Sequence, residues 1–233
     1  MTNTAPHNRK IVVFGATGDV GREVVSEAVL RGYQVTAIAR DIAKLSALPD
    51  IVARQSIDIL ANPEIVAEVL ADHDVAVSSL RPATGQETLL PEMTKVLLDA
   101  ARQSKTPIFV TGGAATLKLA DGSGHTVLSA PDFLPDSVRP IAEACEQVDI
   151  LFDQYDDVRW TCLRPPAMLI PGEKTRNYVR GTDTLVTDHD GVARISFADF
   201  GVAMADLVDA SFDAGISNPQ RLTVGYRSQV AAA

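Results

Sequence analysis

This sequence of 233 residues has little of what marks several protein classes. Its only cysteines are Cys145 and Cys162, and no CxxC or Cys/His spacing occurs. A disulfide scaffold and a cysteine-ligated metal site are therefore excluded, and a reduced, cytoplasmic setting is favoured. No apolar run approaches the ~18 residues that cross a bilayer. Residues 1–10 lack the apolar centre of a secretory signal, so we expect no membrane partner.

The chain also has few basic residues for its acidic content. Its formal net charge is −9, and no dense Lys/Arg run interrupts it. Polyanions would be repelled, which argues against nucleic acid as a partner. At 46% hydrophobic residues, the chain can bury a sizeable core, and its length fits a single domain.

What the sequence does have is a regular alternation of short apolar runs and helical spacing. Strands are predicted at residues 11–14, 34–39, 50–57, 75–77, 108–110, 158–163 and 221–226. Helices are predicted at 20–29, 42–48, 63–70, 90–100 and 141–152, with a last helix opened by Ser196 or Asp199 and running through Ala210. This order predicts an α/β fold with a doubly wound parallel sheet in a three-layer α/β/α arrangement.

Two long irregular segments interrupt the alternation, at about 112–138 and 167–195. Both follow the carboxyl ends of predicted strands, where open α/β sheets bind their ligands. We expect these segments to be substrate loops for a small molecule, in a protein that is a monomer or a homodimer.

A glycine-rich turn joins the first predicted strand to the first predicted helix. Its sequence is Gly15-Ala16-Thr17-Gly18-Asp19-Val20-Gly21. Gly15 allows a sharp turn, Gly18 lets the backbone approach a diphosphate, and Gly21 allows close helix packing. The helix N-terminus adds free N–H groups for phosphate. We predict dinucleotide binding at Gly15, Thr17, Gly18, Asp19, Val20 and Gly21; a turn that binds nothing is the alternative.

The end of the second strand indicates which dinucleotide binds. Arg40 ends that strand, where an arginine would pair with the 2′-phosphate of NADP, and Asp41 is better placed as a helix N-cap. NADPH is therefore the preferred cofactor, with NAD possible. The alternative makes Asp41 the ribose ligand and Arg40 a solvated surface charge.

Further cofactor contacts are predicted at the ends of the later strands. Asp58 and Ile59 are placed to flank adenine, with an ordinary loop acid as the alternative reading of Asp58. The remaining candidates line the central ribose or the nicotinamide: Ser78, Ser79, Leu80, Arg81, Thr111, Gly112, Gly113, Pro165 and Ala167.

These residues together resemble the atypical short-chain dehydrogenase/reductases. Later blocks narrow the resemblance to the NADH-flavin reductase group, which is related to biliverdin reductase B and the NmrA-like proteins. The blocks are Thr111-Gly112-Gly113-Ala114-Ala115-Thr116-Leu117, Ala130-Pro131-Asp132-Phe133, Pro171-Gly172-Glu173-Lys174-Thr175 and Ile195-Ser196-Phe197-Ala198-Asp199-Phe200. The resemblance spans about Lys10 to Tyr226 and implies a Rossmann fold, NAD(P)H binding and reduction of flavins or similar conjugated acceptors.

The sequence also departs from its relatives. No tyrosine begins the Tyr-x-x-x-Lys pair of typical short-chain dehydrogenases, and Ala167 follows Pro165-Pro166 where biliverdin reductase B has His. Arg176 stands where the group usually has Gly. An alkoxide product needs a positioned acid, whereas a conjugated product spreads its charge, so a conjugated acceptor is favoured.

Thr116 is the candidate for a polar catalytic contact, against the alternative of a loop threonine that bonds its own backbone. Two other functions remain open: an NADP-sensing regulator of the NmrA-like kind, and a reductase or isomerase of a specialised pathway.

Overall fold

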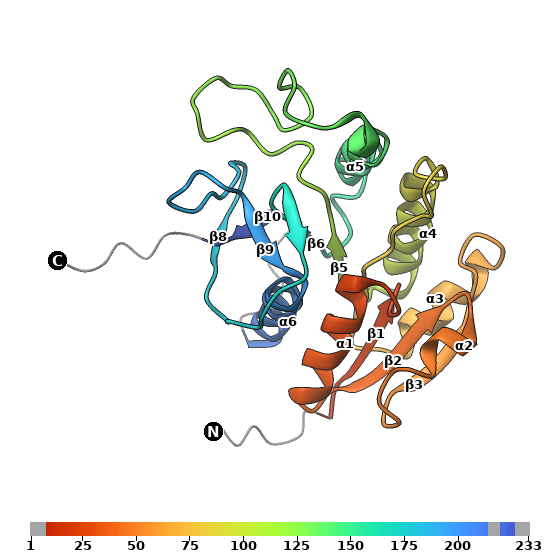
Figure 1. The fold of residues 1–233 in the computed structure, drawn as a ribbon. Helices are drawn as coiled ribbons and strands as arrows, with labels where there is room; N and C mark the ends of the chain where they lie inside the picture. The colour runs from red at the N-terminus through yellow and green to blue at the C-terminus, as the bar shows by residue number, and fades with distance from the viewer. Residues whose placement is uncertain (1–7, 214–219, 227–233) are drawn as a thin grey trace.

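The computed structural model describes residues 8–213 and 220–226, so residues 1–7 of the N-terminal stretch considered above lie outside it. An eight-stranded sheet runs in the order β3-β2-β1-β4-β5-β6-β10-β8 (Figure 1). All neighbouring strands are parallel except β8, which pairs antiparallel with β10. The strands are β1 (Lys10–Phe14), β2 (Gln34–Ala39), β3 (Ala53–Ser56), β4 (Val75–Ser78), β5 (Ile108–Thr111), β6 (Trp160–Arg164), β8 (Val179–Gly181) and β10 (Gln220–Gly225).

Helices cover both faces of this sheet, which confirms the doubly wound α/β fold (Figure 1). The helices are α1 (Asp19–Leu30), α2 (Ile42–Leu45), α3 (Pro63–Ala71), α4 (Leu89–Ser104), α5 (Arg139–Phe152) and α6 (Phe197–Asp213), with a short 3₁₀ turn at Asp136–Val138. Side chains of β1 alternate between the faces: Val12 and Phe14 pack with α3, α4 and α5, while Ile11 and Val13 pack with α1, α2 and α6.

Several predicted boundaries were wrong. The helix predicted over 42–48 ends at Leu45, and the strand predicted over 50–57 is limited to Ala53–Ser56, with largely exposed residues. Of the two residues predicted to open the last helix, Ser196 does so: it precedes Phe197, and its Oγ accepts a hydrogen bond of 2.9 Å from the Asp199 N–H, as an N-cap side chain does. The segment predicted to be irregular from 167 contains three short strands, β7 (Met168–Ile170), β8 and β9 (Arg194–Ser196). Strands of three residues are too short to leave a readable period.

The two irregular segments are joined to each other rather than independent. The Lys118 N–H donates to the carbonyl of Asp183 at 2.8 Å, and the Leu185 N–H donates to the carbonyl of Lys118 at 2.8 Å. Side chains from the same two segments form a small buried apolar cluster: Leu117, Val127, Leu185 and Ala193. We call residues 114–134 and 182–193 together the loop cap.

Candidate active site

A cleft of about 610 Å³ opens at the carboxyl ends of β1, β2 and β4. Strand order reverses between β1 and β4, and open α/β sheets bind nucleotides at such a switch point. The lining residues come from the ends of β1 and β2, the glycine turn, the loops that follow β2, β3 and β4, and the helices α2 and α4: Phe14, Gly15, Thr17, Gly18, Ile38, Ala39, Arg40, Lys44, Ile57, Asp58, Ile59, Leu60, Ala61, Ser79, Leu80, Arg81, Pro82, Gln86, Leu89 and Met93.

Packing explains two of the three glycines in the turn. Gly15 has a φ of 73°, and a Cβ there would lie 2.5 Å from the carbonyl oxygen of Ser79. A Cβ at Gly21 would lie only 2.1 Å from the carbonyl oxygen of Gly15. The nearest atom to a Cβ at Gly18 is that same oxygen at 3.4 Å, an ordinary contact. Gly18 therefore leaves space on the cleft side that the fold itself does not use.

The N-terminus of α1 is suited to an anionic group. Its N-cap is Gly18, which has no side chain to accept hydrogen bonds from the first turn. The N–H groups of Asp19, Val20 and Gly21 have no carbonyl four residues earlier within the helix, so they are available to a diphosphate. The carboxylate of Asp19 pairs with Arg22, which offsets its negative charge near this end.

Three cations line the cleft: Arg40, Lys44 and Arg81. Their side chains are exposed, and none forms an ion pair or hydrogen bond with other described residues. Asp41 instead accepts a hydrogen bond of 2.9 Å from the Ala43 N–H and caps α2. This geometry fits the N-cap role predicted for Asp41 and leaves Arg40 and Lys44 available to a phosphate.

The structure brings about half of the predicted cofactor residues into the cleft: Gly15, Thr17, Gly18, Arg40, Asp58, Ile59, Ser79, Leu80 and Arg81. The carboxylate of Asp58 accepts hydrogen bonds from the N–H groups of Leu60 and Ala61, so it also shapes its own turn. The predicted residues outside the lining are Asp19, Val20, Gly21, Ser78, Thr111, Gly112, Gly113, Pro165 and Ala167.

Sequence reasoning missed lining residues that follow β4. Pro82 and Gln86 lie in the loop after the strand, and Leu89 and Met93 lie in the first turns of α4. Their position after a predicted strand end was the available signal.

The glycines after β5, predicted to line the ribose or the nicotinamide, are packed closely by side chains of the protein itself. A Cβ at Gly112 would lie 2.6 Å from Cys162 Sγ and 3.0 Å from Arg164 Cγ, and one at Gly113 would lie 2.5 Å from Cys145 Sγ. Close packing therefore accounts for both glycines, and their contact with the cofactor stays a prediction.

Thr116 belongs to a polar cluster that also contains Asp149 of α5, Arg164 of β6 and Arg221 of β10. Its hydroxyl donates to Asp149 and accepts from Arg164 Nη1 at 3.2 Å. Arg221 completes the cluster, with Nε donating to Asp149 Oδ1 at 3.0 Å. The hydroxyl proton of Thr116 is therefore already engaged, and its catalytic role stays a prediction.

All four tyrosines are bonded to carboxylates. Tyr33 donates to Asp209, Tyr178 to Asp206, Tyr155 to Asp99 at 2.7 Å and Tyr226 to Asp199 at 2.6 Å. Burial and the adjacent carboxylate raise the pKa of Tyr155 to about 12, and the same causes raise the pKa of the other three. A phenol with a raised pKa is a poor proton donor at neutral pH.

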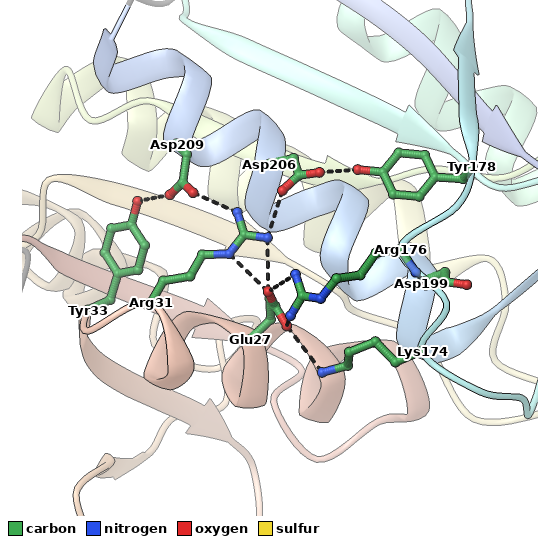
Figure 2. A network of polar contacts seen from close by, with 9 residues as sticks. All are labelled: Glu27, Arg31, Tyr33, Lys174, Arg176, Tyr178, Asp199, Asp206 and Asp209. Carbon is green, nitrogen blue, oxygen red and sulfur yellow. Dashed lines mark hydrogen bonds and ion pairs between the residues drawn. The ribbon is translucent and has the colours of Figure 1, made fainter. Parts of the chain in front are cut away.

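Residues 174–178 of the second irregular segment, which we call the strap, lie on α1 and α6 (Figure 2). Glu27 of α1 is 1% exposed and contacts three cations, Arg31, Lys174 and Arg176. Arg31 continues the network to Asp206 and Asp209 of α6. Asp199 accepts hydrogen bonds from Thr175 Oγ1 at 2.6 Å and the Arg176 N–H at 2.7 Å. This part of the predicted substrate loop is therefore fixed to the helices.

Across residues 8–213 and 220–226, none of the helices has both the length and the apolar composition that a bilayer span requires.

Comparison with known proteins places this geometry in a family. Residues 15–207 match the NAD(P)H-binding family. The protein YwnB of Bacillus subtilis, which is uncharacterised, is 32% identical over 201 residues, covering 84% of this chain and 91% of YwnB.

Two solved structures have a fold similar to that of this chain. A "putative NADH-flavin reductase" from Streptococcus pneumoniae is 25% identical, covers 94% of this chain and 100% of its own, and has a TM-score of 0.80. A "putative epimerase" from Bacteroides thetaiotaomicron is 25% identical, covers 95% and 98%, and has a TM-score of 0.82. These matches confirm the predicted Rossmann fold, and the chain belongs to the NAD(P)H-binding family.

Proposed function

We propose that this protein is an NADPH-dependent oxidoreductase that reduces a flavin-like, quinone-like or other conjugated small molecule, and that it acts in the cytoplasm as a monomer or homodimer. The free cysteines Cys145 and Cys162 suit that compartment. A bound NADPH would supply the hydride.

The preference for NADPH over NADH is supported by the charge of the cleft. Arg40 and Lys44 follow β2, at the position where the adenosine ribose lies in open α/β sheets. A 2′-phosphate would give these cations a partner, whereas the bare ribose hydroxyl of NADH would not. The uncapped N-terminus of α1 would hold the diphosphate in either dinucleotide.

The class of acceptor is inferred from the state of the acidic side chains. Each tyrosine hydroxyl is bonded to a carboxylate, and Thr116 donates to Asp149. His125 and His189 are exposed, and His73 is bonded to the Val69 carbonyl and to Thr36. A ketone would need an acid that these groups are poorly placed to supply. A conjugated acceptor can take its proton from water, so the protein needs only to hold it against the cofactor.

This proposal is tested by following NADPH oxidation with FMN, riboflavin and a soluble quinone, beside a simple ketone. We expect turnover with at least one conjugated acceptor and none with the ketone. The Gly18→Ala variant is a matched control with weakened cofactor binding. The fold has space for a Cβ at this position, but the methyl group would stand where the diphosphate approaches the backbone, so turnover should fall. Turnover with the ketone alone would contradict the proposal.

The second candidate is a regulator that binds NADP without turnover. The engagement of the tyrosine and Thr116 hydroxyls by carboxylates supports this function as well, since a sensor needs no proton donor. Tight NADPH binding with no oxidation by any acceptor would select the sensor over the reductase.

A further inference from the structure

Arg164, at the end of β6, contacts both irregular segments. Its Nη1 lies 3.2 Å from Thr116 Oγ1, in the first segment. Its Nη2 donates to the Thr182 carbonyl at 2.6 Å and lies 3.2 Å from Asp183 Oδ1, in the second segment. These segments are 48 and 18 residues away from Arg164 along the chain, so one guanidinium connects parts that the sequence separates.

The surrounding fold makes room for this side chain. Arg164 is 3% exposed, and a Cβ at Gly112 would lie 3.0 Å from its Cγ. Glycine at position 112 therefore allows the arginine stem to pass the end of β5. The planar guanidinium then reaches four oxygens in a fixed geometry, including Asp149 Oδ2 at 3.5 Å.

Stability alone does not account for a buried arginine here. Its Nε–H is buried without a partner among the described residues, which is a cost. Asp149, its partly buried anionic partner, already pairs with Arg221 at 3.0 Å and does not require a second cation. A buried ion pair contributes little net stability but can fix one arrangement among several.

We propose that Arg164 is a positioning residue that fixes both segments of the loop cap to the end of β6, so that they close over the acceptor as one unit. The closure over the acceptor rests on the proposed function. The coupling of the two segments through Arg164 does not depend on it. The two segments are also joined directly, because the Lys118 N–H donates to the Asp183 carbonyl and the Leu185 N–H donates to the Lys118 carbonyl. Arg164 adds the connection of both segments to β6.

Hydrogen exchange of the whole protein tests the coupling without any assay of activity. We compare wild type, Arg164→Lys and Arg164→Met with Arg221→Lys as the matched control. Arg221 shares Asp149 with Arg164, but its side-chain hydrogen bonds go only to Asp149 of α5 and to Asp153, the C-cap of that helix. In both Arg164 variants, we expect the amides of residues 116–119 and 182–185 to exchange about tenfold faster together. The Arg221 variant should leave both close to wild type.

A second pair of variants keeps the test decisive if the Arg164 variants fold poorly. Thr116→Val removes a contact of Arg164 from the first segment, and Thr116→Ser keeps the hydroxyl. Thr116→Val should speed exchange at residues 182–185 as well as at 116–119, and Thr116→Ser should restore both. Faster exchange in one segment only, or an equal effect of Arg221→Lys, would overturn the proposal.

Steady-state kinetics and NADPH titration then test whether the loop cap acts on acceptor binding. With Arg164→Lys, we expect the KM for the acceptor to rise about fivefold. The Kd for NADPH should stay at the wild-type value, because Arg164 does not line the cleft. An equal change in both constants would also overturn the positioning role. If wild type reduces no acceptor, the proposed function fails, while the exchange pattern still decides whether Arg164 couples the two segments.

Discussion

Arg176 Nη1 lies 2.8 Å from Oε1 of the buried Glu27, although Arg176 holds a left-handed backbone with a φ of 56°. That conformation costs a residue with a Cβ about 1–2 kcal/mol. Glycine, which the related group usually has here, would avoid the cost. The Arg176 N–H also donates to Asp199, and the side chain reaches across to α1. The strained backbone at Arg176 thus goes together with two contacts that hold the strap, one to Glu27 of α1 and one to Asp199 of α6.

This relationship predicts an unusual order of stability at position 176. Arg176→Gly removes both the strain and the ion pair, whereas Arg176→Ala removes the ion pair and keeps the strain. We expect the Ala variant to be less stable than the Gly variant by about 1 kcal/mol, the reverse of the order at an ordinary backbone position. Urea unfolding of the two variants measures the difference. An Ala variant equal to or more stable than the Gly variant would contradict the strain.

Glu27 should contribute far more to stability than an exposed glutamate does. Glu27→Ala leaves three cations, Arg31, Lys174 and Arg176, without their shared carboxylate. Removing one partner of a buried ionic group costs about 3–5 kcal/mol. Glu68→Ala, on the exposed face of α3, is the matched control and should change the free energy of unfolding by less than about 0.5 kcal/mol. Similar losses in the two variants would show that the network is not needed.

The same carboxylate predicts how stability depends on pH. Burial acts to raise the pKa of Glu27, but hydrogen bonds from Arg176, Arg31 and Lys174 outweigh it and hold the pKa below its ordinary 4.5. A lowered pKa in the folded state means stability that is fully present above 4.5 and is lost as the pH falls through the folded value. Unfolding of wild type and Glu27→Gln should therefore differ most near neutral pH and converge in acid. A gap that is constant over this range would contradict the lowered pKa.

The sequence predicted the first half of the fold well because its signals are local. Buried parallel strands such as β1 read as continuous apolar runs, and the second strand was predicted with the bounds that it has, Gln34–Ala39. The region after Pro166 was harder. The strands β7, β8 and β9 have three residues each, and β8 is defined by its pairing with β10 some forty residues later.

In the candidate site too, residues with local sequence signals were predicted, whereas contacts between distant parts of the chain were not. Gly15 and Arg40 are found from their places beside predicted strands. The hydroxyl of Thr116 was interpreted without its partners, because Asp149 and Arg164 are 33 and 48 residues away along the chain. The packing around Gly112 and Gly113 was not predictable for the same reason, since Cys145, Cys162 and Arg164 come close to them only in the folded protein.

Arg40 should determine the choice between the two dinucleotides. Its side chain is exposed at the cleft and has no partner among the described residues, so its removal should leave the fold intact. A charged hydrogen bond is worth about 1.5–3 kcal/mol, so Arg40→Ala should reduce the NADP⁺ over NAD⁺ preference by roughly 10- to 100-fold. Titration of both dinucleotides measures the ratio. Asp41→Ala, which removes the cap of α2, is the control that should lower stability without changing the ratio.

Gly18 and Gly21 separate the needs of the fold from the needs of the ligand. A Cβ at Gly21 would meet the Gly15 carbonyl at 2.1 Å, so Gly21→Ala should distort the turn and lower stability together with binding. A Cβ at Gly18 would meet nothing closer than 3.4 Å, and its φ of −75° is ordinary for alanine. Alanine is a poorer N-cap than glycine, so Gly18→Ala should lower the free energy of unfolding by about 0.5–1 kcal/mol and leave the fold intact.

Binding should nevertheless suffer in Gly18→Ala, because the new methyl group would occupy the side from which the diphosphate approaches the backbone. We expect the Kd for NADPH to rise at least about tenfold. Calorimetric titration and urea unfolding of the same preparations measure the two quantities together. Wild-type affinity in a stable Gly18→Ala variant would mean that the diphosphate does not lie at the N-terminus of α1, and the dinucleotide would then have to bind elsewhere in the fold.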